Sequence, residues 1–147
     1  MTAAGSTIEP DIYVLDLANS QFTRVTTDSQ STLASWHPNG QQIATGSTSF
    51  RGDTVTWVRP LYDLRKREVL QRGEKRVTAF SYGPPGGYAV MTMWPDSNNS
   101  DLWIAHMDSL SKPRPFLTEP YDEGTARVSP DGKVVAYFTN RTGSTEL

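Results

Sequence analysis

The side chains best suited to chemistry in this sequence are two histidines and a polar loop, PDSNNSD, at residues 95–101. His37 and His106 lie in unrelated surroundings, outside any H-E-x-x-H motif or carboxylate cluster at ligand spacing. The loop carries oxygen ligands that suit calcium, but it lacks the D-x-D-x-D-G spacing. Cysteine and a G-x-S-x-G nucleophile elbow are absent. We therefore predict no catalytic residue, no metal site and no cofactor.

Two further short motifs have simpler explanations than a function. Residues 51–53 spell Arg-Gly-Asp, but Asp53 is explained as the first residue of a repeated strand. Asn98 and Asn140 begin glycosylation sequons, yet nothing in the sequence points to a secretory route.

Composition indicates an ordinary globular domain. The chain has 147 residues, of which 36% are hydrophobic and 20% are charged, with a net charge of -2. Seven of its 14 basic residues lie between Arg59 and Arg76, against three acidic ones. We interpret this segment as the solvated outer rim of a sheet and predict no nucleic-acid partner.

Nothing in the sequence predicts a membrane location. No apolar run approaches the roughly 20 residues that span a bilayer. The first ten residues, MTAAGSTIEP, lack the basic start and apolar stretch of a signal peptide. The compartment stays unknown and is cytoplasmic by default.

Apolar residues follow a two-residue rhythm that predicts an all-β fold. Short strands alternate with turn clusters such as HPNG, GPPGG and SPDGK. The best helical candidate, DLRKREVLQR, has flanks that suit a strand, a charged turn and another strand.

Three marks recur along the chain. Asp-led strands start at Asp11, Asp53 and Asp101, at intervals of 42 and 48 residues. The turn glycines Gly40 and Gly132 are 92 residues apart, and a degenerate copy, FSYGPPGGYAVMTM, lies between them. The third mark is the series FTRVTTD, REVLQRG and RPFLTEP. Periods of about 40 to 50 residues with four short strands each are typical of β-propeller blades.

These residues resemble the TolB-type, WD40-like β-propeller repeat. DIYVLDL, TRVTTD and ASWHPNGQQIATGS match its D-I-Y-V strand, R-L-T strand and W-S-P-D-G-K turn. The segment from Asp101 to Leu147 resembles propeller repeats attached to bacterial receptor-like kinases and to prolyl-oligopeptidase-type hydrolases. The resemblance covers nearly the whole chain and implies the fold; propellers serve many roles.

In the Ser129-Pro130-Asp131-Gly132 turn, proline presets a backbone angle, aspartate bonds to the backbone beyond it and glycine supplies a positive φ. We expect Trp36 and Val128, beside such turns, to pack between blades.

The repeat marks divide the chain into about three blades of four antiparallel strands. Residues 11–26 form an outer half blade, 33–70 and 77–118 form whole blades, and 124–147 form an inner half blade and the start of the next strand. Three blades do not close a ring, whereas two copies give six. We therefore expect a homodimer in which the half blades of two chains complete each other. The alternative is a fragment of a longer propeller protein.

Propeller function usually lies in the loops around the channel mouth. These loops lead into first strands or join second to third strands, and they carry the candidate binding residues Phe50, Arg51, Trp94, Tyr121, Asp122, Glu123 and Arg141.

Two hypotheses follow from these loops. The first is a non-enzymatic scaffold that binds a protein, peptide or glycan at one face. The second is an enzyme-associated propeller, a hydrolase or lyase with its site at the shared pore mouth. We favour the first, because no catalytic motif is found.

Overall fold

The computed structural model describes residues 10–48, 54–73, 75–94 and 99–144, and nearly all of their regular structure is β-strand. The exception is one 3-10 turn at Met107–Ser109. The predicted all-β class is confirmed, and the stretch DLRKREVLQR forms a turn followed by a strand. No helix in these ranges is long and apolar enough to cross a bilayer.

Two four-stranded antiparallel sheets form the centre of the chain. Sheet I has the order β3 (Ser31–Trp36), β4 (Gln42–Thr48), β5 (Thr54–Pro60) and β6 (Glu68–Gly73). Sheet II has the order β7 (Arg76–Ser81), β8 (Tyr88–Trp94), β9 (Asp101–His106) and β10 (Arg114–Leu117). Each strand pairs with the next one along the sequence, so each sheet is a simple meander.

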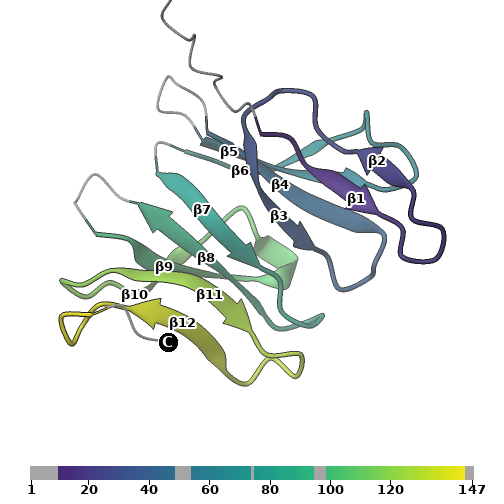
Figure 1. Cartoon of the computed structure of the whole chain (residues 1–147). Coiled ribbons are helices and arrows are strands. Elements are labelled where there is room, and N and C mark those ends of the chain that lie inside the picture. Colours follow the sequence, from purple (N-terminus) through teal and green to yellow (C-terminus); the bar gives the residue numbers. More distant parts are fainter. Residues whose placement is uncertain (1–9, 49–53, 74, 95–98, 145–147) are drawn as a thin grey trace, which may run out of the picture.

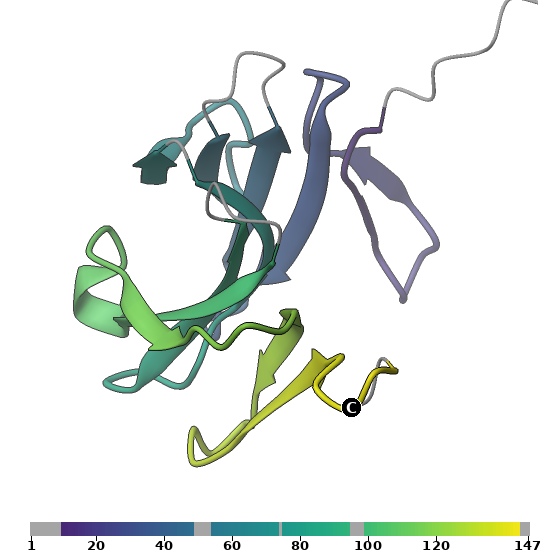
Figure 2. The same cartoon turned by 90° about the vertical axis from the view of Figure 1, so that its left-hand side faces the viewer.

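A two-stranded sheet flanks this pair on either side. The N-terminal hairpin consists of β1 (Tyr13–Leu15) and β2 (Phe22–Arg24). The C-terminal hairpin consists of β11 (Glu123–Val128) and β12 (Val135–Thr139). Figure 1 shows the four units side by side, and Figure 2 shows them in an arc with the two hairpins at its ends.

Three glycine turns join the first two strands of sheet I, sheet II and the C-terminal hairpin. Gly40, Gly86 and Gly132 have φ values of 67°, 71° and 73°, as a turn with left-handed backbone requires. In the last turn, the Asp131 carboxylate accepts the Ser129 hydroxyl at 2.6 Å and the Lys133 amide at 3.2 Å. The predicted roles of glycine and aspartate are confirmed there.

Strand register corrects the sequence alignment of the repeats. Trp57 lies opposite Thr45 in sheet I, and Trp103 lies opposite Met91 in sheet II. Both pairs lie three positions after the first pair of their ladder, β4–β5 or β8–β9, and Thr45 and Met91 each follow their turn glycine by five residues, so Trp57 and Trp103 are equivalent. Val55 then takes the place of Asp101, and the expectation that Asp53 leads the repeat is wrong by two residues. Asp53 itself lies outside the described residues.

The core lies between neighbouring sheets. Leu33 and Ala44 of sheet I pack against Phe80 and Met91 of sheet II. A second cluster joins sheet II to the C-terminal hairpin and contains Val90, Leu102, Ile104, Ala126, Val128, Val135 and Tyr137. Both faces of sheet II are apolar, because alternate side chains of its strands point toward sheet I on one face and toward the C-terminal hairpin on the other.

Val128 and Trp36, the two residues expected to pack between blades, differ in their burial. Val128 packs in the second cluster, as predicted. Trp36 is 50% exposed, so the expectation of a buried tryptophan is wrong within this chain. Its cross-strand partner is Ile43, which in turn lies opposite Arg59. On this face Arg59 lines a cavity together with Arg24 of the N-terminal hairpin, which has only two strands, and Trp36 on β3 stays exposed.

Candidate functional site

The candidate residues that the structure describes lie at the end of the sheets where β3, β7 and β11 begin (Figure 1). Phe50 and Arg51 lie outside the described residues. Trp94 ends β8 with 41% of its surface exposed, and Arg141 lies exposed in the turn after β12. The other three candidates, Tyr121, Asp122 and Glu123, are consecutive at the start of β11.

Asp122 connects three segments of the chain. Its Oδ1 accepts the backbone N–H of Ser100 at 3.0 Å and the Ser100 hydroxyl at 3.3 Å. Its Oδ2 accepts the side-chain amide of Asn140 at 3.0 Å, and its own N–H donates to Asn140 Oδ1 at 2.9 Å. We call Ser100, Asp122 and Asn140 the Asp122 clamp. It ties the loop before β9 to both strands of the C-terminal hairpin.

Asn140, the first residue of a glycosylation sequon, belongs to this clamp. Both the nitrogen and the oxygen of its side-chain amide form hydrogen bonds with Asp122. A small cavity of about 90 Å³ lies beside it, lined by the clamp residues and by Phe138 and Thr139.

Glu123 is the buried carboxyl group of this end of the molecule. The residue is 2% exposed, and its Oε2 has no hydrogen-bond partner. Burial raises the pKa of Glu123, and the nearby carboxylates of Asp101, Glu119 and Asp122 raise it further. The protonated form of Glu123 therefore persists to a higher pH than that of an exposed glutamate.

Asp101 lies near this carboxyl group, and Lys75 lies near Asp101. Burial raises the pKa of Asp101, and the positive charge of Lys75 acts in the opposite direction. The Lys75 ammonium lies 4.2 Å from the ring centre of Trp103, within cation–π range. Carboxyl groups thus outnumber cations around Glu123. In the described part of the chain, no three His, Asp or Glu side chains are grouped to hold a metal ion.

A second clamp, centred on Asp11, was not predictable from the sequence. Asp11 Oδ1 accepts the Thr26 hydroxyl at 2.9 Å and the Ser29 N–H at 3.2 Å, while Oδ2 pairs with Arg24. Burial opposes the shift, but the bonds from Arg24 and Thr26 lower the pKa of Asp11 below its ordinary value. The repeated Asp-led strand was the one sequence signal for the Asp11 clamp. The partners of Asp11 are 13 to 18 residues away, and no spacing rule identifies them.

Both histidines have local partners. His37 Nδ1 accepts the Asn39 N–H at 3.2 Å, and its ring lies edge-on to Tyr82. His106 Nδ1 accepts the Asp108 N–H at 3.3 Å and its ring lies edge-on to Tyr88. Each ring packs on an aromatic side chain beside a turn.

Comparison with solved structures identifies the fold. The chain superposes on TolB from Acinetobacter baumannii with a TM-score of 0.73 and 19% identity over 91% of this chain. It superposes on an oligogalacturonate lyase in complex with manganese with a TM-score of 0.71 and 12% identity over 95%. The β-propeller domain of the Trilobed protease from Pyrococcus furiosus, described with an open velcro topology, gives 0.53 and 12% over 92%.

The chain therefore has a TolB-like β-propeller fold. It spans 33%, 40% and 48% of these three chains, respectively. No protein-family model matches the sequence, and a comparison with curated proteins found no match. Sequence identities below 20% support a shared fold but not a shared function.

Proposed function

We propose that this protein is a non-enzymatic binding scaffold that completes a six-bladed propeller by pairing with a second copy of itself. Each copy contributes sheet I, sheet II and the two hairpins, so two copies supply six blades. The observation that supports this assembly is that the two hairpins have complementary unpaired strand edges, one on β12 and one on β1.

Each hairpin has a free strand edge. In the complete sheets, the second strand pairs with the third, as β4 does with β5 and β8 with β9. β12 corresponds to a second strand and β1 to a third strand, and their pairing edges face no other described strand. Free edges of this kind favour pairing with another chain.

The complete sheets define the register of the proposed contact. Gly132 matches Gly40, so Tyr137 takes the place of Thr45, whose partner is Trp57. DIYVLDL aligns with DLWIAHM, so Tyr13 takes the place of Trp103, the equivalent of Trp57. Tyr137 of one copy should therefore lie directly opposite Tyr13 of the other, and Val135 opposite Leu15.

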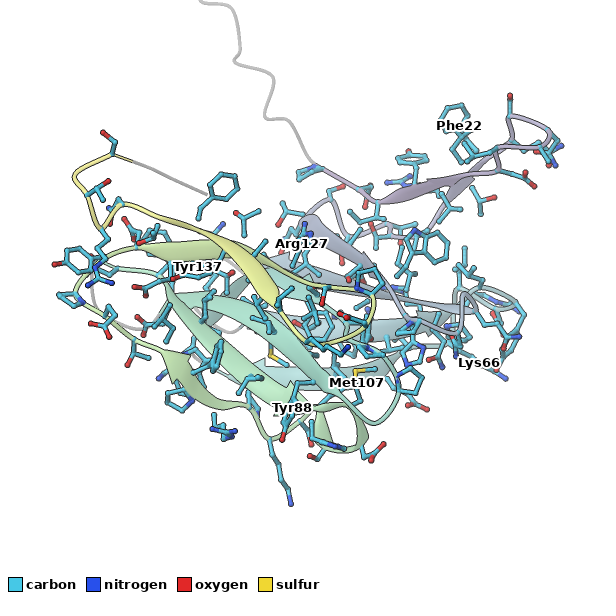
Figure 3. All side chains as sticks on the ribbon, turned by 90° about the horizontal axis from the view of Figure 1, so that it is seen from below. Phe22, Lys66, Tyr88, Met107, Arg127 and Tyr137 are labelled. Carbon is cyan, nitrogen blue, oxygen red and sulfur yellow. The ribbon has the colours of Figure 1, made fainter. Side chains whose placement is uncertain are left out.

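Exposed apolar side chains gather on the surfaces that this pairing would cover. Tyr13 and Leu15 are about half exposed on one face of the N-terminal hairpin, and Figure 3 shows Phe22 on the outer side of that hairpin. On the C-terminal hairpin, Val134 and Phe138 are exposed on the face opposite the core contacts of Val135 and Tyr137.

Trp36 supplies the matching surface. In the completed ring, the open face of a second copy's C-terminal hairpin lies against the part of sheet I where Trp36 is exposed. Val134 and Phe138 would cover this tryptophan, as Ala126 and Val128 cover Val90 between sheet II and the C-terminal hairpin within one chain. Burying several such side chains contributes about 1.5–3 kcal/mol each.

Cysteine cross-linking tests the register, because the chain has no cysteine of its own. In the variant Tyr13→Cys/Tyr137→Cys, directly opposed cysteines meet the geometry of a disulfide, and oxidation should give a covalent dimer on a non-reducing gel. Light scattering should give a mass twice the 16.3 kDa of one chain.

The matched control is Val14→Cys/Tyr137→Cys. Val14 is adjacent to Tyr13 in β1 and points to the other face of the sheet, so it should cross-link poorly. A stable folded monomer, or equal cross-linking of the two variants, would contradict the assembly.

Under this proposal, each candidate loop is presented twice across the pore, which suits a symmetric or extended protein, peptide or glycan ligand. Trp94, Tyr121 and Arg141 offer exposed or half-exposed side chains for such contacts. Asp122 is occupied by its clamp and would position the loop.

The alternative is an enzyme-associated propeller, and Glu123 is the observation in its favour. A buried carboxyl group with a raised pKa is suited to general acid–base catalysis. One structural neighbour is an oligogalacturonate lyase. Cleavage of oligogalacturonate by this chain, lost in Glu123→Gln although the variant stays folded, would favour the alternative, and turnover that is absent or equal in both proteins would oppose it.

A further inference from the structure

Four arginines line one cavity between the N-terminal hairpin and the outer strands of sheet I. The cavity has a volume of about 400 Å³, and Arg24, Arg59, Arg65 and Arg67 contribute to its wall with a single carboxylate, that of Asp28. Its volume is at the lower end of the range for small-molecule sites. The lining therefore carries an excess of positive charge, although the whole chain has a net charge of -2.

Arg59 is the buried member of this group, with 6% of its surface exposed. Its Nε donates to the Thr45 hydroxyl at 3.3 Å and one terminal nitrogen donates to the Leu64 carbonyl at 3.1 Å. No carboxylate within the described ranges forms an ion pair with it. A buried guanidinium with only neutral partners is costly, so a bound anion would stabilise it.

The neighbouring charges meet this requirement only in part, because the Asp28 carboxylate attracts Arg59 while the Arg67 guanidinium repels it. Arg67 lies with its guanidinium 4.2 Å from the ring centre of Trp57, and Arg24 is paired with Asp11. Both carboxylate oxygens of Asp28 accept the Ser31 hydroxyl, at 2.9 and 3.1 Å. Arg65 pairs with Asp63 at 3.2 Å on the exposed loop after β5.

We propose that this cavity binds the phosphate group of a small phosphomonoester. Guanidinium groups donate parallel hydrogen bonds to phosphate oxygens, and several of them converge here on one space. The volume exceeds that of a bare ion, which leaves room for a small organic group beside Val25 and Leu64. All of these residues belong to one chain, so the site does not depend on the proposed dimer.

The test is the stabilisation of the purified protein by sodium phosphate and by glycerol 3-phosphate, each compared with sodium chloride at equal ionic strength and with glycerol. Both phosphates should raise the melting temperature of the native protein, because a ligand that binds only the folded state stabilises it. Tighter binding of glycerol 3-phosphate identifies a phosphomonoester site. Equal affinities identify a site for free phosphate and overturn the organic part of the proposal.

Arg59→Met separates binding from a structural role. Methionine keeps a long side chain and removes the buried charge, so the variant should fold with unreduced stability and bind phosphate about tenfold or more weakly. If Arg59 were purely structural, the variant would lose stability and keep its response to phosphate, which would overturn the proposal.

Two further variants cover the case in which Arg59→Met does not fold. Arg67→Gln changes an exposed arginine of the cavity and should also weaken phosphate binding. Arg114→Gln changes an exposed arginine on β10, outside the cavity, and should leave binding unchanged. Equal responses of these two variants, or no difference between phosphate and chloride in the native protein, would refute the site.

Discussion

Replacing Asp122 by alanine should detach the C-terminal hairpin from the loop before β9. The change removes a carboxylate that accepts two hydrogen bonds from Ser100 and one from Asn140. Ser100 is 5% exposed, so its N–H would be left without an acceptor away from water. A hydrogen bond to a charged group contributes about 1.5–3 kcal/mol, and part of that is recovered where water can enter. We expect the free energy of unfolding to fall by about 3 kcal/mol.

Urea unfolding at one fixed protein concentration measures this loss, because association would make stability depend on concentration. Asp16→Ala is the matched control: the Asp16 carboxylate accepts two hydrogen bonds, at 2.8 and 3.0 Å, but within an exposed turn. It should cost about 1 kcal/mol or less. Hydrogen exchange should accelerate in β11 and β12 of Asp122→Ala. Equal losses for the two variants would refute the clamp as the element that holds the hairpin.

Two other predictions concern pH and a turn. Burial and neighbouring carboxylates raise the pKa of Glu123, so the native protein loses stability as the pH rises above the ordinary value of 4.5. Glu123→Gln should therefore melt at a higher temperature than the native protein near about pH 7, and the difference should vanish near about pH 4. A difference independent of pH would contradict the titration of Glu123. Gly132→Ala should cost more stability in urea than Gly40→Ala: both glycines have positive φ, but an added Cβ at residue 132 would lie 2.7 Å from the Pro84 ring, whereas residue 40 has open space. Equal losses would show that the Pro84 contact relaxes.

The strands and turns were predictable because they depend on local spacing. Alternating apolar residues and the turn glycines Gly40 and Gly132 identified the blades of a propeller. The position of Asp53 was misread because the aspartate suggested a repeat start, whereas pairing in the sheet sets the equivalence through Trp57 and Trp103.

The contacts between segments were not predictable in the same way. Asp122 was named as a loop residue, but its bonds to Ser100 and Asn140 join residues 18 to 22 positions apart. The basic segment was recognised and interpreted as a solvated rim. Arg59 is nevertheless buried, because its face of sheet I lies under the N-terminal hairpin, which is distant in sequence.

The free edges of β1 and β12 also determine what happens when pairing does not close. A head-to-tail contact that misses the angle of a two-fold ring leaves one edge open at each end, and further copies can then add to form a filament. In the proposed dimer, closure after two copies would use both edges of both chains and stop growth. Blocking β12 in one copy and β1 in another leaves a single compatible pair of edges, so that mixture ends at an open pair joined by one contact. Under the proposed pairing, the two edges would therefore behave as polymer ends that can be capped independently.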